Sequence, residues 1–209
     1  MENEEVIVLE AKTNPEAFGR LYDMYYQPIF AFVLSRIGNV EVSKDICSET
    51  FFQALKNISK YKPKGRPFKS WLFAIAVAQV GNYYRKRSKM LAITIDECPE
   101  LVAADIYQPD FSAIEDETEL EIKEQVVQLR RLMGQLNQKQ QTILTLRYFS
   151  HMTIPEISQV IKMKEGTIKS HLHRALKKLH VLMTEEDLKN EYDSAGATQS
   201  RTAFGVSGV

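Results

Sequence analysis

The sequence predicts an all-α protein in which an acidic, flexible linker joins two small helical domains. Three observations favour this fold class. Apolar residues recur at steps of three and four through 15–87 and 121–183, which is the period of an amphipathic helix, and no stretch alternates like a strand. Between them, residues 88–120 contain nine acidic side chains, one basic side chain and two prolines. A chain of 209 residues that is 44% hydrophobic suits two such domains.

The first domain, residues 1–87, is expected to hold three long helices. The helical pattern starts at Pro15, and Pro28 is expected to separate or kink the first helix. A second helix follows Gly38 and Asn39, and it turns six side chains toward the core: Ile46, Cys47, Thr50, Phe51, Ala54 and Leu55. After the loop 61–67, a third helix is apolar in its first half and ends in the basic run 85–87.

The second domain, residues 121–183, is expected to end in two short helices joined by a tight turn. One or two helices over 121–149 break near 134–137. Thr153 and Glu156 then form a capping box, so a helix begins near Ile154. After the turn 162–164 the next helix begins at 165–167. This pattern predicts a helix-turn-helix, whose second helix typically enters the major groove of DNA.

The helix that follows the turn has two chemically different faces. An apolar face is predicted to pack in the core: Ile168, Leu172, Ala175, Leu176 and Leu179. A polar and basic ridge faces solvent: Lys169, Ser170, His173, Arg174 and Lys177. Taken alone, such a helix is more often an ordinary amphipathic helix with a solvated basic face. The preceding capping box and turn favour a helix that reads DNA.

The charge of the chain is unevenly distributed, although its net value is zero. Residues 1–87 carry a net charge of +4 and residues 121–183 carry +7, whereas 88–120 carry −8 and 184–209 carry −3. Exposed charges more than about 10 Å apart are largely screened at physiological salt. Each basic segment is therefore able to bind a polyanion locally, despite the neutral total.

The residues that catalysis, metals or cofactors need are not arranged for such roles. Cys47 and Cys98 are too far apart for a CxxC motif and are predicted to be free thiols, with Cys47 buried. His171 and His173 point about 200 degrees apart on a helix, so they cannot converge on zinc. No nucleophile motif, phosphate loop or carboxylate pair stands out. The sequence predicts no enzyme, no cofactor and no metal site.

The remaining segments give expectations about order and location. Residues 88–120 are interpreted as a linker. Residues 184–209 end in small, polar, aperiodic residues and are predicted to be a disordered tail. The sequence holds no apolar run of 18 residues and no signal pattern at its start. We therefore expect a cytoplasmic protein that does not insert into a membrane.

Aromatic and basic side chains alternate around the loop 61–69 and the basic run 85–87. Bases of single-stranded DNA stack on aromatic rings for about 1–3 kcal/mol each, while cations hold the backbone. Trp71 and Phe73 are interpreted as core residues because they lie in the apolar half of the helix. Phe68, Tyr83 and Tyr84 are expected to be more open.

Together these motifs resemble the extracytoplasmic-function (ECF) sigma factors, the promoter-recognition subunits of bacterial RNA polymerase. The segments FGRLYDMYYQPIFAFVLSRIG, DICSETFFQAL and FKSWLFAIA resemble sigma region 2 over 18–87. EGTIKSHLHRA resembles region 4 over 121–183, although other helix-turn-helix families share it. Ala78 and Asn82 depart from the residues that many members have, so no base contact is assigned inside that helix. Lys162 replaces the usual turn glycine, which implies a left-handed residue there.

The resemblance implies binding to core RNA polymerase and to promoter DNA, and restraint by an anti-sigma factor. It implies three groups of contact residues. The minus-35 element would be read by Arg147, Lys169, Ser170, His173, Arg174 and Lys177. The minus-10 element, with one base flipped into the loop, would contact Lys62, Lys64, Arg66, Phe68, Lys69, Tyr83, Arg85, Lys86 and Arg87. Core polymerase would contact Asp45, Glu49 and Phe52.

Two other interpretations remain open at the level of sequence. A helix-turn-helix regulator that binds duplex DNA without polymerase would also account for residues 165–176. A helical adaptor without DNA contact would account for the neutral net charge. The linker 88–120 would thread the RNA exit channel of the polymerase by resemblance, or serve as a plain solvated spacer.

Overall fold

The computed structural model describes residues 4–63, 66–95, 128–129 and 131–202 of the chain, and all regular structure within them is helical. The all-α prediction is therefore confirmed. The helices and helical turns are, in order, α1 (Glu4–Glu10), α2 (Pro15–Ile37), α3 (Val40–Asn57), η1 (Ile58–Lys60), α4 (Phe68–Ile95), α6 (Gln138–Leu144), η3 (Thr145–Phe149), α7 (Ile154–Ile161) and α8 (Glu165–Thr202). Within the described part of the chain, none of these helices is both long enough and apolar enough to span a bilayer.

Helix α1 was not predicted from the sequence. It has seven residues, too few to show a clear apolar period, and its first turn contains Glu4 and Glu5. Carboxylates at this end interact favourably with the helix dipole. Ile7 and Val8 are buried, and the helix packs against α2. Packing against the first domain thus supplies stability that so short a helix lacks by itself.

Helix α2 is bounded by two local signals. The side chain of Asn14 accepts a hydrogen bond from the Glu16 backbone N–H at 2.9 Å, and Gly38 ends the helix with φ 78°. Of the two expectations for Pro28, separation into two helices is wrong, because one helix runs through it, and a kink stays a prediction. Pro28 lies on the exposed side, while Tyr25 and Ile29 are buried. Burial of these neighbours holds the helix together where proline removes one backbone hydrogen bond.

Helix α3 turns one face into the core. Five of the six predicted core residues are buried: Ile46, Cys47, Thr50, Phe51 and Ala54. The sixth prediction is wrong, because Leu55 is 47% exposed. At 100° per residue Leu55 lies about 110° from the centre of the buried face, outside the stripe. Cys47 is a free thiol as predicted, and burial raises its pKa to about 12.

Helix α4 extends beyond the end that the basic run predicts. Its first half is buried through Phe68, Leu72, Phe73, Ala76 and Val80. The predicted end near Arg87 differs from the structure, in which the helix continues to Ile95. No proline or glycine follows Arg87 before that point. A helix that is already nucleated propagates through such residues. Most of the predicted linker, residues 96–120, lies outside the described residues.

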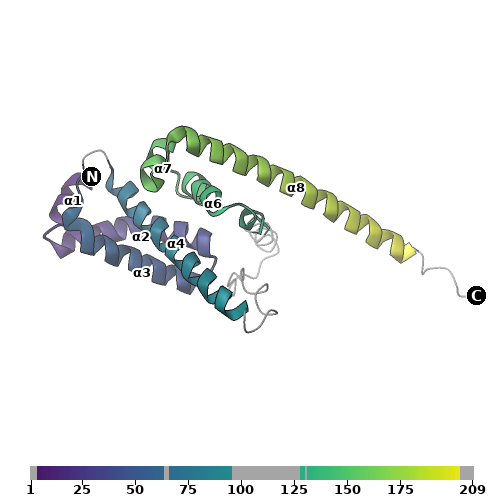
Figure 1. Ribbon diagram of the computed structural model, residues 1–209, viewed down its shortest axis with the longest axis horizontal. Coiled ribbons are helices and arrows are strands. Elements are labelled where there is room, and N and C mark those ends of the chain that lie inside the picture. The colour runs from purple at the N-terminus through teal and green to yellow at the C-terminus, as the bar shows by residue number, and fades with distance from the viewer. Residues whose placement is uncertain (1–3, 64–65, 96–127, 130, 203–209) are drawn as a thin grey trace, which may run out of the picture.

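The second domain has its own small core and the predicted helix-turn-helix. The predicted break near 134–137 is present, and α6 begins with a capping box between Asn137 and Gln140. Leu132, Met133, Leu136, Leu144, Ala175 and Leu179 form one buried cluster. α7 and α8 then form the helix-turn-helix (Figure 1).

Helix α8 is much longer than its domain. The sequence predicts a disordered segment from residue 184, whereas the structure continues the helix to Thr202. Figure 1 shows this helix projecting away from the rest of the molecule. The added residues include Glu, Lys, Leu and Ala, which favour helices, and no proline interrupts them. Residues 203–209 lie outside the described part.

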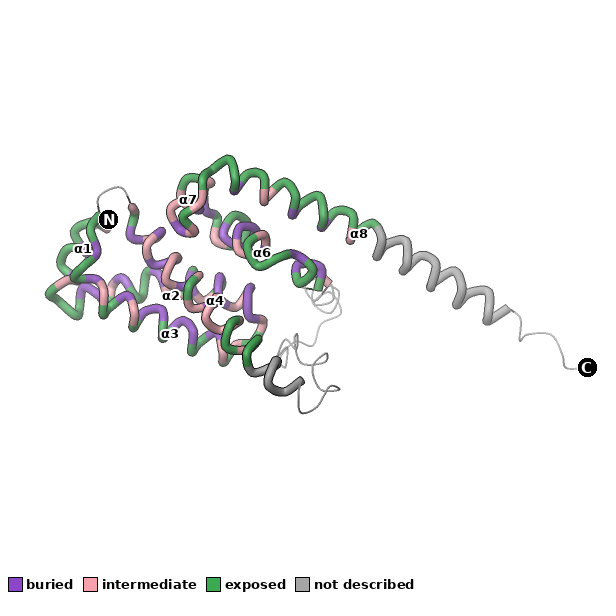
Figure 2. The backbone as a smooth tube through the Cα atoms, in the orientation of Figure 1, coloured by how far each residue is buried: buried purple, intermediate pink, exposed green. Residues whose placement is uncertain are grey.

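The two domains pack directly against each other. Helix α4 packs against α7, and α2 packs against η3. One core cluster joins Phe73 and Val80 of the first domain to Ile157 and Val160 of the second. Figure 2 shows that both α4 and α7 contain buried segments. The sequence predicts two modules on a linker and gives no sign of this shared core.

Candidate nucleic-acid interface

The start of α7 is built as the sequence predicts. The Thr153 backbone N–H donates to the Glu156 carboxylate at 2.7 Å, and the Glu156 backbone N–H donates to the Thr153 hydroxyl at 3.4 Å. Burial raises the pKa of Glu156, but the hydrogen bonds from Thr153 outweigh it, so the net pKa is lowered. The capping box therefore holds a charged carboxylate at the helix N-terminus.

The turn between α7 and α8 rests on a left-handed residue. Lys162 has φ 54° and ψ 48°, as predicted from its place in the turn. The Ser158 hydroxyl donates to the Met163 carbonyl at 2.6 Å, which ties the end of α7 to the turn. The Ile168 N–H donates to the Lys164 carbonyl at 3.1 Å as α8 begins. These contacts orient the first turns of α8.

The basic ridge of α8 is exposed along its whole length, whereas the opposite face is buried through Ile168, Ala175 and Leu179. One core prediction is wrong, because Leu176 is 42% exposed. Leu176 lies about 80° from the centre of the buried face at 100° per residue. The exposed ridge consists of Lys169, Ser170, His173, Arg174 and Lys177.

Two ridge side chains are oriented by bonds to their own helix. The Ser170 hydroxyl donates to the Gly166 carbonyl at 2.9 Å, and Arg174 Nε donates to the Ser170 carbonyl at 3.2 Å. Arg147 lies outside α8, on η3, where its Nη1 donates to the Met152 carbonyl at 2.9 Å. This bond fixes the guanidinium beside the segment that leads into α7.

The loop before α4 is supported by an aromatic cluster. The prediction that Phe68 is open is wrong, because this residue is 3% exposed. Its ring centroid lies 5.6 Å from that of Tyr25, 5.7 Å from Tyr61 and 5.5 Å from Trp71. Phe68 begins α4, so the helix direction aims it at α2, which the sequence alone does not reveal. The buried Phe68 ring therefore packs on the core side of the loop before α4 and supports it.

The cations of this loop lie in different environments. Lys62 is exposed and Lys69 is half-buried, while Lys64 lies outside the described residues. Arg66 is half-buried, and its Nη2 donates to the Ser70 carbonyl at 3.2 Å. The Tyr61 hydroxyl donates to the Arg66 carbonyl at 2.7 Å. The aromatic cluster and these bonds together shape the loop.

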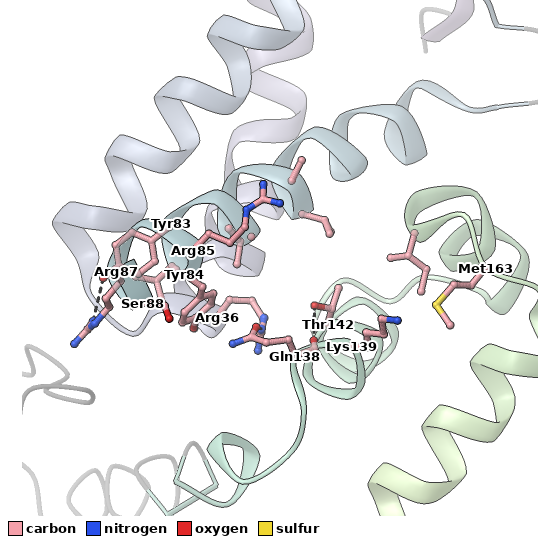
Figure 3. Close-up of a pocket in the computed structure, with 16 residues that line it drawn as sticks. Arg36, Tyr83, Tyr84, Arg85, Arg87, Ser88, Gln138, Lys139, Thr142 and Met163 are labelled. Carbon is pink, nitrogen blue, oxygen red and sulfur yellow. Dashed lines mark hydrogen bonds between the residues drawn. The ribbon is translucent and has the colours of Figure 1, made fainter. Parts of the chain in front are cut away.

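Two residues of the basic run of α4, Arg85 and Arg87, line a cavity of about 880 Å³ between the two domains. Tyr83 and Tyr84 are half-buried, consistent with the predicted openness relative to Phe73. Arg87 Nη1 donates to the Tyr83 hydroxyl at 3.1 Å, and Arg85 donates to the Asn82 side chain. Figure 3 shows Tyr84 of α4 on one side of the cavity, and Gln138 and Lys139 of α6 on the other. Lys86 is exposed and does not line it.

The predicted polymerase-binding residues share an exposed face of α3. Asp45 and Glu49 are exposed, and Phe52 is 58% exposed. Gln53 Nε2 donates to the Glu49 carboxylate at 2.8 Å along this face. Leu55 adds apolar surface beside it. An exposed phenylalanine flanked by carboxylates suits a protein partner better than DNA, whose phosphates repel carboxylates.

Sequence reasoning assigned no role to Arg36, which the structure buries between the domains with 2% exposure. One signal was present. Phe32, Val33, Arg36 and Ile37 follow the spacing of the buried stripe of α2, so Arg36 is a charged residue in a core position. A buried guanidinium needs partners, and those lie on α6.

Family models and curated relatives match both domains. The model "Sigma-70 region 2" matches residues 21–90, and "Sigma-70, region 4" matches 127–179. The chain is 31% identical over 172 residues to the ECF RNA polymerase sigma factor BldN of Streptomyces coelicolor, covering 82% of this chain and 62% of BldN. It is 30% identical over 142 residues to the ECF sigma factor ShbA of Streptomyces griseus, covering 66% of this chain and 70% of ShbA.

Solved structures share the fold. CnrH, solved in complex with the cytosolic domain of CnrY, matches with a TM-score of 0.66 and 18% identity, over 87% of this chain and 97% of CnrH. RpoE of Bartonella quintana, solved with the anti-sigma factor NepR, matches with a TM-score of 0.60 and 19% identity, over 80% of this chain and 96% of RpoE. With regions 2 and 4 both matched and ShbA so similar, the chain belongs to the ECF RNA polymerase sigma factors.

Proposed function

We propose that this chain is a dissociable specificity subunit that binds core RNA polymerase and directs initiation at promoters with a minus-10 and a minus-35 element. The observation that carries the proposal is the exposed ridge on α8, which is the second helix of a capped helix-turn-helix. Sigma factors are not enzymes by themselves, so every role assigned below is one of binding and positioning.

The ridge of α8 would read the minus-35 element as an intact duplex. Lys169, Ser170 and His173 lie nearest the start of the helix, the end that typically meets base edges. Arg174 would donate two hydrogen bonds to guanine, which contribute about 1–3 kcal/mol of discrimination. Lys177 and Arg147 would contact phosphates. Phosphate contacts fix position without reading sequence.

The loop before α4 and the basic run 85–87 would bind the minus-10 element. Opening the duplex costs a few kcal/mol per flipped base, which cations and stacking surfaces must offset. Lys62, Arg66 and Lys69 would supply cations at the loop. Because Phe68 is buried, we place it beneath the loop, where it shapes the base pocket without stacking on the base. The half-buried Tyr83 ring would lie beside the separated strand.

The exposed face of α3 would dock on core polymerase. Asp45 and Glu49 would interact with basic side chains of the partner, and Phe52 would bury its ring in the contact. Burying an aromatic ring of this kind is typical of residues that dominate protein interfaces. By resemblance to the family, this face would dock on the clamp coiled coil of the largest polymerase subunit.

An anti-sigma factor is the further partner that we propose. RpoE of Bartonella quintana, which has the same fold, was solved with the anti-sigma factor NepR. Such a partner would compete with polymerase or promoter by covering exposed faces of regions 2 and 4. Action in the cytoplasm follows from the proposed partners, core polymerase and promoter DNA.

Run-off transcription with purified bacterial core polymerase tests the proposal. Genomic fragments are transcribed with core alone and with core plus this chain, and the new 5′ ends are sequenced. We expect new transcripts whose upstream regions share two motifs at a constant spacing. Failure to form a complex with core would overturn the proposal. Sequence-specific footprints on duplex DNA without polymerase would instead favour the stand-alone regulator.

A further inference from the structure

Arg36 joins the two domains through a buried network. It lies near the end of α2 in region 2, and its partners lie on α6 of region 4. Its Nη2 donates to Gln138 Oε1 at 2.7 Å, and its Nη1 donates to Gln141 Oε1. Gln141 is 6% exposed, and its Nε2 donates to the Leu136 carbonyl at 2.8 Å. The guanidinium of region 2 is therefore bound within the fold of region 4.

The same side chain is fixed from the side of region 2. Its guanidinium carbon lies 5.7 Å from the centre of the Tyr84 ring, within the range of a cation–π contact. The Tyr84 hydroxyl donates to the Arg36 carbonyl, which ties α4 to the end of α2. Figure 3 shows Arg36 between Tyr84 and Gln138. Arg36 is thus held on both sides of the domain boundary, and we call its contacts with Gln138 and Gln141 the Arg36 latch.

Apolar contacts continue the interface beyond the Arg36 latch. Helix α7 lies against α4, and Ile157 and Val160 are 0% and 4% exposed in a cluster that includes residues of α4. Val77 and Tyr83 of α4 line the cavity between the domains. Tyr83 and the basic run of α4 are residues that we assign to the minus-10 element, so region 4 stands beside their binding surface.

This arrangement cannot span a promoter. The elements are named for positions about 25 base pairs apart, which is about 85 Å of duplex at 3.4 Å per base pair. Globular domains of about 90 and 60 residues have radii near 16 and 13 Å, so in contact they extend over about 60 Å at most. The ridge of α8 and the loop before α4 both lie within those bodies. Simultaneous binding therefore requires regions 2 and 4 to separate.

We infer that the Arg36 latch sets the balance between the closed arrangement, in which region 4 docks on region 2, and the open form that promoter binding requires. The inference rests on the proposed function, because only promoter binding makes closure inhibitory. Core polymerase and promoter would favour the open form by binding it more tightly.

The test changes Gln138, which is exposed at the first turn of α6 and tolerates substitution better than buried Arg36. Gln138→Lys places a cation against Arg36 and should open the chain, whereas Gln138→Glu adds a charged acceptor and should close it further. Hydrogen bonds to charged groups are strong enough that each change should shift the closed-to-open ratio by about tenfold or more. Gln135→Lys, on an exposed residue of the turn before α6, is the matched control for added charge.

Energy transfer between dyes on the full-length chain reports closure. Exposed Gln27 of α2 and exposed His180 of α8 are replaced by cysteine in a Cys98→Ser background. Cys47 stays unlabelled, because it is buried and its pKa is raised to about 12. We expect high transfer in the parent, lower transfer for Gln138→Lys, and no change for Gln135→Lys. Core polymerase with promoter should lower transfer in the parent.

Transcription separates this inference from the proposed function. Gln138→Lys should raise run-off product at limiting chain concentration, and Gln138→Glu should lower it, with equal product from all variants at saturation. Two results would overturn the closed state if transcripts still appear normally: low energy transfer in the parent, or energy transfer that neither Gln138 variant changes. Either result would leave the sigma-factor assignment intact. Absence of transcripts from every variant would overturn the proposed function instead.

Discussion

At the scale of single residues, Lys162 and Arg174 show how the helix-turn-helix separates stability from recognition. Lys162 has φ 54°, a region where a side chain is costly and glycine is not. Arg174 is exposed and contributes to the ridge rather than to the core. Substitutions at these two positions should therefore change different measurements.

Lys162→Gly should stabilise region 4 by about 0.5–1 kcal/mol, because it relieves the left-handed strain. Thermal unfolding of the full chain would show this as a higher midpoint. The control is Lys164→Gly, which removes the same charge at a residue without positive φ and should lower stability. Equal effects at both positions would show that charge rather than backbone conformation is responsible.

Arg174→Ala should weaken minus-35 dependent initiation by about 1–3 kcal/mol, roughly 5- to 150-fold. Affinity for core polymerase should stay unchanged, since the residue lies on the DNA-facing ridge. Lys178→Ala removes the same charge from the same helix, at a side chain that donates to the Gln135 carbonyl within region 4, so it should affect initiation far less. A parallel fall in core affinity for Arg174→Ala would contradict the role assigned to the ridge.

At the scale of elements, α7 and α3 are each held by a local pattern that also leaves a functional surface exposed. The capping box fixes where α7 begins and thereby where α8 points. Helix α3 buries Phe51 and exposes the next residue, Phe52. Adjacent side chains on a helix diverge by about 100°, so one element serves the core and a partner together.

The capping box should make region 4 sensitive to acid. The pKa of Glu156 in the folded chain lies below its unfolded value, which is near 4.3. The stabilisation is therefore present above that pH and is lost as pH falls through the folded pKa. Glu156→Gln keeps the capping hydrogen bonds and should lose less stability between pH 7 and pH 3 in thermal melts. An equal loss of stability in both proteins would show that the Glu156 carboxylate does not cause the acid sensitivity.

The two neighbouring phenylalanines of α3 give a sharp contrast. Phe52→Ala should lower affinity for core polymerase by at least tenfold with little change in unfolding, since the side chain is 58% exposed. Phe51→Ala should cost about 3–5 kcal/mol of stability, because that ring is 4% exposed in the core. Core binding measured by fluorescence anisotropy and unfolding by circular dichroism would distinguish them. Unchanged core affinity for Phe52→Ala would exclude this face as the docking site.

At the scale of the whole molecule, the shared core makes the two domains one cooperative unit. Calorimetry of the parent should therefore show one transition whose calorimetric and van't Hoff enthalpies agree. Gln138→Lys weakens the Arg36 latch and should separate the transition into two, or make the calorimetric enthalpy exceed the van't Hoff value. Two transitions in the parent would show that regions 2 and 4 unfold independently.

The sequence by itself determined the main helices of both domains, the capping box of α7 and the basic ridge of α8. These features depend on neighbours within a few positions, such as Thr153 with Glu156 or Ile168 with Ala175. Phe68 was misplaced because its burial depends on a distant helix, whereas Leu55 and Leu176 lie outside the buried stripes of their own helices. Helix α1 was not predicted, because a segment of seven residues is too short to show a clear apolar period.

Only the tertiary structure decided the burial of Arg36, its contacts with Gln138 and Gln141, and the docking of region 4 on region 2. These contacts join residues about a hundred positions apart, and no local period or cap encodes such a pairing. Local hydrogen bonds and apolar spacing specify helices, whereas the free energy of burying one helix face against another depends on the surface that meets it in space.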